Sequence, residues 1–479
     1  MTVDYQGLRD TFEAAGQGHI FAFFEQLTAA EQEEFLSQLA QIDVEEATKT
    51  AKKALEKHGQ PEEACAFEPI PEDVIVDVEN NRNRDAWFAM GMDLIRKNQV
   101  AVILMAGGQG TRLGSPDPKG CYNIGLPSGK SLFQLQAERI RRLQTLAATD
   151  GQDAVIPWYI MTSGPTDKPT RDFFTKNNYF GLNPENIIFF QQGVMPCFTH
   201  DAKFMLEGKG KLAVAPDGNG GIYGALHKEG VIKSLKERGI RYSHCYCVDN
   251  CLARVADPAF IGYCASRNTD CGIKVVPKSH PEEPVGVVAR RNGKYGVVEY
   301  SEISAELAHM RQENGQLAFG AANIVNHFFS TEFLERVPSF AHELQYHVAN
   351  KKIPHIDTTT GEFVKPTKPN GIKLERFVFD VFGHSNAFSV LQVSRDDEFS
   401  PLKNAPGAGV DCPETSRAAI LDQSRRFIQK AGGHFKDDTI EIEVSPLLSY
   451  AGENLEAVSG NTIQRSGILT NLEDIALAL

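Results

Sequence analysis

The chain has 479 residues, of which 42% are hydrophobic and 23% are charged, as in an ordinary globular protein with a large core. The formal net charge is −13, and nucleic-acid binding usually needs a basic face, so we expect no nucleic-acid partner. A few placed cations can still hold a small anionic substrate in an acidic protein. The nine cysteines show no common zinc spacing and indicate reduced thiols.

The beginning of the chain has no basic stretch followed by an apolar run, which a signal peptide would require. No stretch approaches the roughly 18 apolar residues that a membrane-spanning helix needs. We therefore expect a cytoplasmic protein with small-molecule partners and no membrane association, present as a monomer or a homodimer.

Residues 1–95 predict a helical N-terminal lobe. Thr28 and Glu31 have the spacing of a capping box, in which each side chain bonds the other residue's backbone N–H. Apolar residues then recur at helical spacing on one face. They are Phe35, Leu36, Leu39 and Ile42.

Residues 96–385 predict a central α/β domain with a doubly wound sheet. Continuous apolar runs favour strands that are buried on both faces of a parallel sheet, and helical patterns separate them. The expected strands are Val100–Met105, Ala154–Met161, Ile187–Phe190, Lys211–Ala215 and Tyr242–Val248. The expected helices contain Leu132–Leu143 and Gly230–Arg238.

Residues 386–479 predict a small C-terminal α+β lobe. Its expected elements are a loop-rich stretch at Asn404–Pro413, a helix at Thr415–Lys430 and a strand at Thr439–Val444.

The most informative motif is Met105-Ala-Gly-Gly-Gln-Gly-Thr-Arg-Leu-Gly114, which follows a buried strand and precedes Lys119. Glycines let backbone N–H groups approach a phosphate closely. The glycine spacing matches neither the dinucleotide-binding pattern nor the P-loop. Arg112 and Lys119 add two cations, which a triphosphate needs where its charge must be neutralised.

This motif resembles the signature loop of the sugar-nucleotide pyrophosphorylases. More closely, the chain from about residue 95 to about residue 455 resembles the eukaryotic UDP-N-acetylhexosamine pyrophosphorylases. The resemblance implies a sheet of the nucleotide-diphospho-sugar transferase type. It also implies that UTP and N-acetylglucosamine 1-phosphate, or the N-acetylgalactosamine compound, react to give the UDP-sugar and pyrophosphate.

The resemblance assigns roles to residues in several further motifs. Gln192 ends a strand, and its amide can pair both a donor and an acceptor with the edge of uracil. Asp249 ends another strand, where a carboxylate can hold Mg²⁺ or Mn²⁺ together with phosphate oxygens. The implied UTP-binding residues are Met105, Ala106, Gly107, Gly108, Lys119, Gln192, Gly218 and Lys373. The implied sugar-binding residues are Asn219, Gly286, Glu299 and Asn323. The implied catalytic cations are Arg112, Lys119, Lys373 and Lys403.

Three alternatives follow from the same motifs. A UDP-glucose pyrophosphorylase, or one with broad UDP-sugar specificity, would share the glycine turn and its cations. A nucleotide-binding regulatory protein without catalysis would be expected to lack Arg112, Lys119 or Asp249, and all three are present. A nicotinamide-dependent oxidoreductase would need a different glycine spacing.

Overall fold

The computed structural model describes residues 4–58 and 67–479, and they form two compact units. The smaller unit combines Met1–Ala66, Gln192–Gly224 and Ser339–Asp380. The larger unit combines Phe67–Gln191, Ala225–Pro338 and Val381–Leu479. These boundaries differ from residues 95 and 385, where the sequence predicts domain borders, because segments far apart along the chain share each core.

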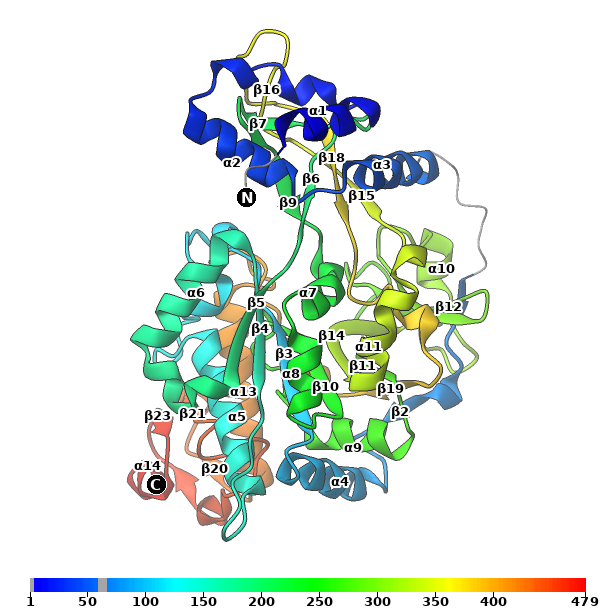
Figure 1. Cartoon of the computed structure of the whole chain (residues 1–479). Helices are drawn as coiled ribbons and strands as arrows, with labels where there is room; N and C mark the ends of the chain where they lie inside the picture. Colours follow the sequence, from blue (N-terminus) through cyan, green and yellow to red (C-terminus); the bar gives the residue numbers. More distant parts are fainter. Residues whose placement is uncertain (1–3, 59–66) are drawn as a thin grey trace. The chain divides into compact units, whose positions relative to one another are not determined.

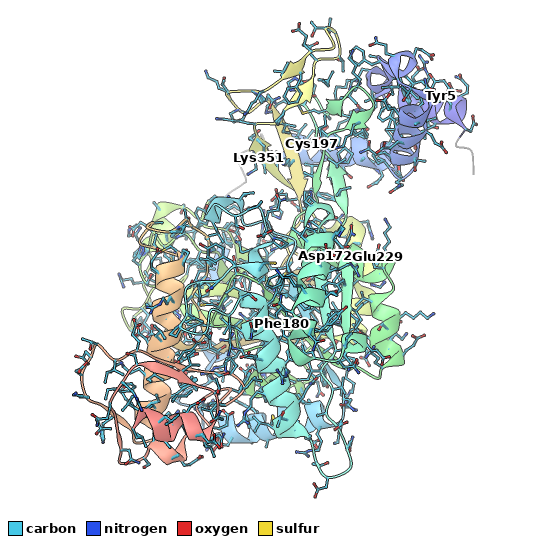
Figure 2. All side chains as sticks on the ribbon, turned by 90° about the vertical axis from the view of Figure 1, so that its left-hand side faces the viewer. Tyr5, Asp172, Phe180, Cys197, Glu229 and Lys351 are labelled. Carbon is cyan, nitrogen blue, oxygen red and sulfur yellow. The ribbon has the colours of Figure 1, made fainter. Side chains whose placement is uncertain are left out.

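Helices at the N-terminus cover the smaller unit's strands. They are α1 (Tyr5–Ala14), α2 (Ala29–Leu39) and α3 (Val44–His58). The predicted capping box of α2 is confirmed, because Thr28 and Glu31 each accept a hydrogen bond from the other's backbone N–H. Phe12 and Phe35 are fully buried in one apolar cluster with Phe198 and Phe204. Figure 2 shows Tyr5 on α1 and, further inside this unit, Cys197.

The smaller unit holds its strands in two-stranded ladders. The pairs are β6 (Val194–Pro196) with β9 (Val214–Pro216), β7 (Leu206–Gly208) with β8 (Lys211–Leu212), β15 (His347–Lys351) with β18 (Gly371–Glu375), and β16 (His355–Ile356) with β17 (Phe363–Val364). The predicted strand Lys211–Ala215 is therefore wrong as a strand of the parallel sheet. It divides into β8 and β9, because Ala213 between them bonds Met205 and Cys197 instead.

The larger unit is built on a mixed sheet with the order β2-β19-β11-β14-β10-β3-β4-β5. These strands are β2 (Ile75–Asp77), β3 (Val100–Met105), β4 (Trp158–Thr162), β5 (Ile187–Gln191), β10 (Tyr242–Cys247), β11 (Cys271–Pro277), β14 (Ala321–Ser330) and β19 (Phe388–Gln392). Strand β14 runs antiparallel to both of its neighbours, whereas the other pairs in this order are parallel. Strands β1 (Phe67–Pro69), β12 (Val287–Arg291) and β13 (Lys294–Val298) extend the sheet beside β14. An alternation of buried strands and helices thus predicts the α/β class but misses the reversed strand.

Strand β4 begins four residues later than the predicted Ala154. Pro157 has no N–H to donate to a neighbouring strand, and proline is typical of a strand's edge or beginning. The other predicted strands Val100–Met105, Ile187–Phe190 and Tyr242–Val248 are confirmed within one residue at each end.

Helices pack on this sheet, and Figure 1 shows strands β3, β4 and β5 side by side within the larger unit. The principal helices are α4 (Arg84–Arg96), α5 (Leu132–Ala147), α6 (Gly164–Lys176), α8 (Val231–Glu237), α9 (Pro258–Ser266), α10 (Ala305–His309), α11 (Thr331–Arg336) and α12 (Arg395–Glu398). Helix α7 (Ile222–Lys228) crosses the boundary between the two units. Phe174 on α6 contacts both Phe133 on α5 and Trp158 on β4, with ring centroids 5.0 Å and 5.4 Å away. These aromatic contacts fix the helices that follow β3 and β4, and thus the turns at the strands' ends.

The C-terminal part of the larger unit has an apolar cluster of its own, which includes Phe427, Ile442 and Ile475. Its elements are α13 (Pro413–Lys430), α14 (Leu472–Ala478), the pair β20 (His434–Phe435) with β22 (Thr462–Ile463), and the pair β21 (Ile442–Val444) with β23 (Gly467–Leu469). The predicted helix at 415–430 is confirmed as α13, and the strand predicted at 439–444 is confirmed over its last three residues. Among the described residues, no helix combines the length and apolarity needed to cross a bilayer.

Candidate functional site

The glycine turn follows β3, whose six residues are all buried. The Ala106 N–H donates to the Met161 carbonyl at 2.8 Å, so the chain leaves the sheet only at Gly107. The Gly107 carbonyl accepts from Ser163 Oγ at 2.8 Å, and the Gly108 carbonyl accepts from the Lys119 N–H at 3.2 Å. Gly107 and Gly108 are therefore held through their carbonyl groups.

Space beside the turn is open at Gly108. A Cβ atom added there would meet no other atom within 4 Å, and Gly108 is exposed. Arg112 lies in a 3₁₀ turn at Thr111–Leu113 and is exposed. In residues 4–58 and 67–479 no carboxylate forms an ion pair with Arg112. An exposed guanidinium beside an open backbone turn is suited to an anion.

Lys119 and Asp249 meet at the same edge of the sheet. Strands β3 and β10 are parallel neighbours, with Met105 opposite Cys247, so the residues after each strand emerge together. The Lys119 Nζ lies 3.5 Å from Asp249 Oδ2, and the two side chains are 19% and 23% exposed. Ligands of α/β sheets bind at the carboxyl ends of parallel strands, and this ion pair stands at that position.

Lys403 joins this group through the backbone. The Leu402 N–H donates to the Asp249 carbonyl at 2.9 Å, and the Lys403 N–H donates to the Asp411 carbonyl at 2.7 Å. Burial raises the pKa of the Asp411 carboxyl; Lys403 opposes this shift and Asp249 adds to it. The structure thus brings Lys119, Asp249 and Lys403 together, and adds Asp411, to which the sequence assigned no role.

The thiol of the partly buried Cys247 is near the same charges. Burial raises the pKa of Cys247 well above its usual value, Asp249 adds to the rise, and Lys119 and Lys403 lower it. Such a thiol stays protonated at neutral pH, so Cys247 is inert and supplies packing beneath the charged group.

Three predicted sugar-binding residues lie together in the larger unit. The Asn323 N–H donates to the Gly286 carbonyl at 2.9 Å. A Cβ atom on Gly286 would lie 3.0 Å from Glu299 Oε1, so this glycine leaves room for the carboxylate. Val325, two residues beyond Asn323, has a φ of 53°, which is rare for a β-branched residue. Its N–H donates to Asn323 Oδ1 at 2.8 Å, so the distorted backbone orients the Asn323 amide.

The predicted residues of the smaller unit form a separate polar group. Gln192 precedes Gly193, whose carbonyl accepts from the Asp217 N–H at 3.3 Å. Asn219 Oδ1 accepts from the Val378 N–H at 2.9 Å, so this oxygen holds the turn. Gly218 has a φ of 85°, a conformation that glycine adopts without strain.

Lys373 belongs to the same unit and lies on β18, opposite Ala349 of β15. Burial raises the pKa of the Cys197 thiol to about 11, and Lys373 opposes this rise, which places its ammonium near Cys197. Among the residues that the structure describes, the Lys373 ammonium forms no ion pair with a carboxylate. It is therefore available to an anionic ligand.

Asp217 received no role from the sequence, although it lies inside the motif that contains Gly218 and Asn219. Its Oδ1 atom is buried and has no hydrogen-bond partner within the described part of the chain. Burial raises the pKa of Asp217 to about 6, and Arg376 opposes the rise. An acid directly before a glycine-rich turn is a visible signal in the sequence, but the surroundings of Asp217 depend on Arg376, 159 positions further along.

The carboxylates near the glycine turn fit a magnesium ion that takes its other ligands from the substrate and water. Among the described residues, no three metal-ligating side chains cluster. Mg²⁺ usually takes one or two protein carboxylates and completes its shell with phosphate oxygens and water. Asp249 supplies one such carboxylate beside the open turn, and Asp411 is near it.

A profile of the UTP–glucose-1-phosphate uridylyltransferase family matches residues 44–473. The chain belongs to this family, as its glycine turn and the cations around it predict.

Several proteins similar to this chain have names that specify an N-acetylated sugar. The chain is 44% identical to the UDP-N-acetylglucosamine pyrophosphorylase of Saccharomyces cerevisiae, over 96% of this chain and 98% of the yeast protein. It is 47% identical to the UDP-N-acetylhexosamine pyrophosphorylase-like protein 1 of Xenopus tropicalis, over 93% of this chain and 92% of that protein. The crystal structure of the Trypanosoma brucei uridine diphosphate N-acetylglucosamine pyrophosphorylase in complex with inhibitor is similar, with a TM-score of 0.83 and 34% identity over 94% of both chains.

Proposed function

We propose that this protein is a uridylyltransferase that converts UTP and N-acetylglucosamine 1-phosphate to UDP-N-acetylglucosamine and pyrophosphate. The Lys119–Asp249 pair beside the open glycine turn carries this proposal, because it sets a cation and a carboxylate where a triphosphate would lie. The names of the relatives support the same substrate class. With this activity, the mixed sheet of the larger unit is of the nucleotide-diphospho-sugar transferase type.

Each predicted residue takes a role in this proposal. The nucleotide is bound by Met105, Ala106, Gly107, Gly108, Lys119, Gln192, Gly218 and Lys373. The sugar is bound by Asn219, Gly286, Glu299 and Asn323. The Asn323 amide nitrogen is suited to a sugar oxygen, because its Oδ1 is already used by the Val325 N–H. Asp249 is the metal ligand.

The reaction needs no protein nucleophile. A phosphate oxygen of the sugar 1-phosphate attacks the α-phosphorus of UTP in line, the bond to the bridging oxygen breaks, and pyrophosphate leaves with the electron pair. A phosphate dianion is already nucleophilic, so catalysis consists of positioning and charge stabilisation. Arg112 and Lys119 neutralise the leaving pyrophosphate, and Lys373 and Lys403 neutralise the charge at the α-phosphate.

Mg²⁺ or Mn²⁺, when bound, would supply a positive charge that offsets the negative charge of the phosphates. Asp249 would hold it, and Lys119, 3.5 Å from the same carboxylate, keeps that oxygen oriented.

The identity of the sugar 1-phosphate is tested by a competition experiment. Pyrophosphate release from UTP, measured with 1-phosphates of N-acetylglucosamine, N-acetylgalactosamine and glucose in competition, compares kcat/KM values directly. We expect the two N-acetylhexosamine substrates to be preferred. A preference for glucose 1-phosphate would instead support a UDP-glucose or broad-specificity UDP-sugar pyrophosphorylase.

Removing one charge-stabilising group commonly lowers the rate by about 10²–10³. We expect Lys119→Ala and Arg112→Ala to lower kcat by about this factor without unfolding the protein. Lys97→Ala is the matched control, because Lys97, directly after α4, also pairs with an aspartate, Asp93 at 2.6 Å, but is 59% exposed. Wild-type turnover in the Lys119 and Arg112 variants would remove the turn from the mechanism.

A further inference from the structure

A buried cluster of charges in the larger unit lies outside the residues assigned to substrates. Lys274 on β11 has a side chain that is 0% exposed, and its Nζ contacts the carboxylates of Asp257 and Glu398. Arg254 Nη1 lies 3.7 Å from the second Glu398 oxygen. Buried charges are costly unless they are paired. Here two cations face two buried carboxylates, and Arg254 also lies 3.6 Å from the less buried Asp397.

The backbone at Glu398 is bonded to the strand end that carries Asp249. Asn250 Nδ2 donates to the Glu398 carbonyl at 2.7 Å, and Asn250 Oδ1 accepts from the Ser400 N–H at 3.0 Å. The Leu402 N–H then donates to the Asp249 carbonyl at 2.9 Å. These hydrogen bonds hold the segment that carries Lys403 against the strand end at Asp249 and Asn250.

Two other carboxylates also hold this segment, but they are less buried. Arg395 at its start pairs with Glu283 at 2.8 Å, and Arg426 pairs with Asp397 at 2.8 Å. The Glu283 and Asp397 side chains are 13% and 23% exposed, whereas that of Glu398 is 2% exposed. Of these three carboxylates, Glu398 is therefore the one whose contacts solvent screens least.

We propose that Glu398, held by Lys274 and Arg254, is a positioning residue for uridylyl transfer: it fixes the segment that carries Lys403 against the strand end that carries Asp249. Glu398 acts on the reaction only through this placement. The inference rests on the proposed function, in which Lys403 neutralises charge at the α-phosphate.

A double-mutant cycle on the whole chain tests this coupling. Glu398→Gln keeps the side chain's shape but removes its charge, and we expect kcat to fall about 10- to 100-fold, as for other residues that orient a catalytic group. The KM values for both substrates should change little, because the substrate-binding residues are intact. In a Lys403→Ala background, Glu398→Gln should lower kcat no further, because the group that it positions is absent.

Glu138→Gln is the matched control for the loss of a buried carboxylate. Glu138 is 3% exposed and pairs with Lys130 at 2.7 Å, and no described contact joins this pair to residues 395–403. We expect Glu138→Gln to lower stability while kcat stays within about twofold of wild type. If Glu398→Gln does not fold, Lys274→Met with Glu398→Gln removes one cation and one carboxylate together, and the same cycle is run on that pair.

The outcomes separate this inference from the proposed function. Wild-type kcat in Glu398→Gln, or equal losses with and without Lys403, would overturn the positioning role while leaving uridylyl transfer intact. Wild-type kcat in Lys403→Ala would also overturn it. Absence of pyrophosphate release by the wild-type protein with every sugar 1-phosphate would instead overturn the proposed function itself.

Discussion

Two glycine-rich loops, one in each unit, look alike in sequence but differ in what occupies the space of the missing side chains. In the larger unit, a Cβ atom on Gly108 would meet nothing within 4 Å. In the smaller unit, Cβ atoms on Gly218 and Gly220 would lie 2.3 Å and 2.6 Å from the carbonyl oxygens of Arg376 and Phe377. The Cβ side of Gly108 is open to a ligand, whereas the Cβ sides of Gly218 and Gly220 are filled by the protein's own backbone. The contact proposed between Gly218 and UTP is therefore made by the other side of the glycine backbone.

The charges near the two loops differ in the same way. Beside the first, Lys119 and Asp249 form a partly exposed ion pair that a phosphate and a metal can rearrange. Beside the second, Asp217 has a buried oxygen without a partner in the described residues and a raised pKa. A glycine-rich pattern therefore does not by itself distinguish a phosphate site from a tightly packed turn; the neighbouring residues do.

The largest effect that this comparison predicts is on stability. Gly220→Ala should lower the free energy of unfolding by about 2–3 kcal/mol, because the added methyl group overlaps the Phe377 backbone. Urea unfolding measures it. Gly224→Ala is the control, since its Cβ atom would meet nothing within 4 Å on helix α7, and we expect no loss of stability. Equal stability of the two variants would contradict the assignment of Gly220 to packing.

Gly108→Ala should weaken UTP binding and leave stability unchanged. Stability should stay within about 0.5 kcal/mol of wild type, because the methyl group enters open space. The KM for UTP should rise about tenfold, equivalent to about 1.4 kcal/mol, because the same space is where the phosphates would lie. Gly296→Ala, also in open space in the larger unit, should change neither quantity. An unchanged KM in Gly108→Ala would mean that the turn is not in contact with UTP.

The smallest effect concerns pH. Asp217 has a pKa of about 6 in the folded protein against an ordinary value of 3.8, so the folded state binds more protons between these values. Stability should therefore decrease as pH rises from about 4 to 6 and then level off, with a slope of at most about 1.4 kcal/mol per pH unit. Asp217→Asn should remove this decrease. Parallel unfolding curves for the two proteins across that pH range would show that the Asp217 carboxyl titrates normally.

Part of the candidate site can be predicted from where the buried strands end. Buried apolar runs locate β3 and β10, and the polar residues after parallel strands gather at one sheet edge, where Lys119 and Asp249 meet. The role of Lys119 follows from the glycine turn, and that of Asp249 from the resemblance to the family. Helix α13 and the α2 capping box follow from local periodicity and side-chain spacing. These features depend on neighbours within a few turns of the chain.

Other features depend on pairings that local patterns do not encode. The reversed direction of β14 is set by its partners β10 and β11, whose paired residues lie 44 to 88 positions earlier in the chain. The burial of Glu398 depends on Lys274, 124 positions away. Neither Lys274 nor Glu398, the last residue of the short helix α12, carries a local pattern that predicts its partner, and only the fold makes them a pair.

The fate of label from UTP tests the central claim most directly. With α-³²P-labelled UTP and N-acetylglucosamine 1-phosphate, attack at the α-phosphorus should place the label in the UDP-sugar and leave the released pyrophosphate unlabelled. Label in pyrophosphate, or transfer of the γ-phosphoryl group to the sugar in a parallel reaction with γ-labelled UTP, would contradict uridylyl transfer by this protein.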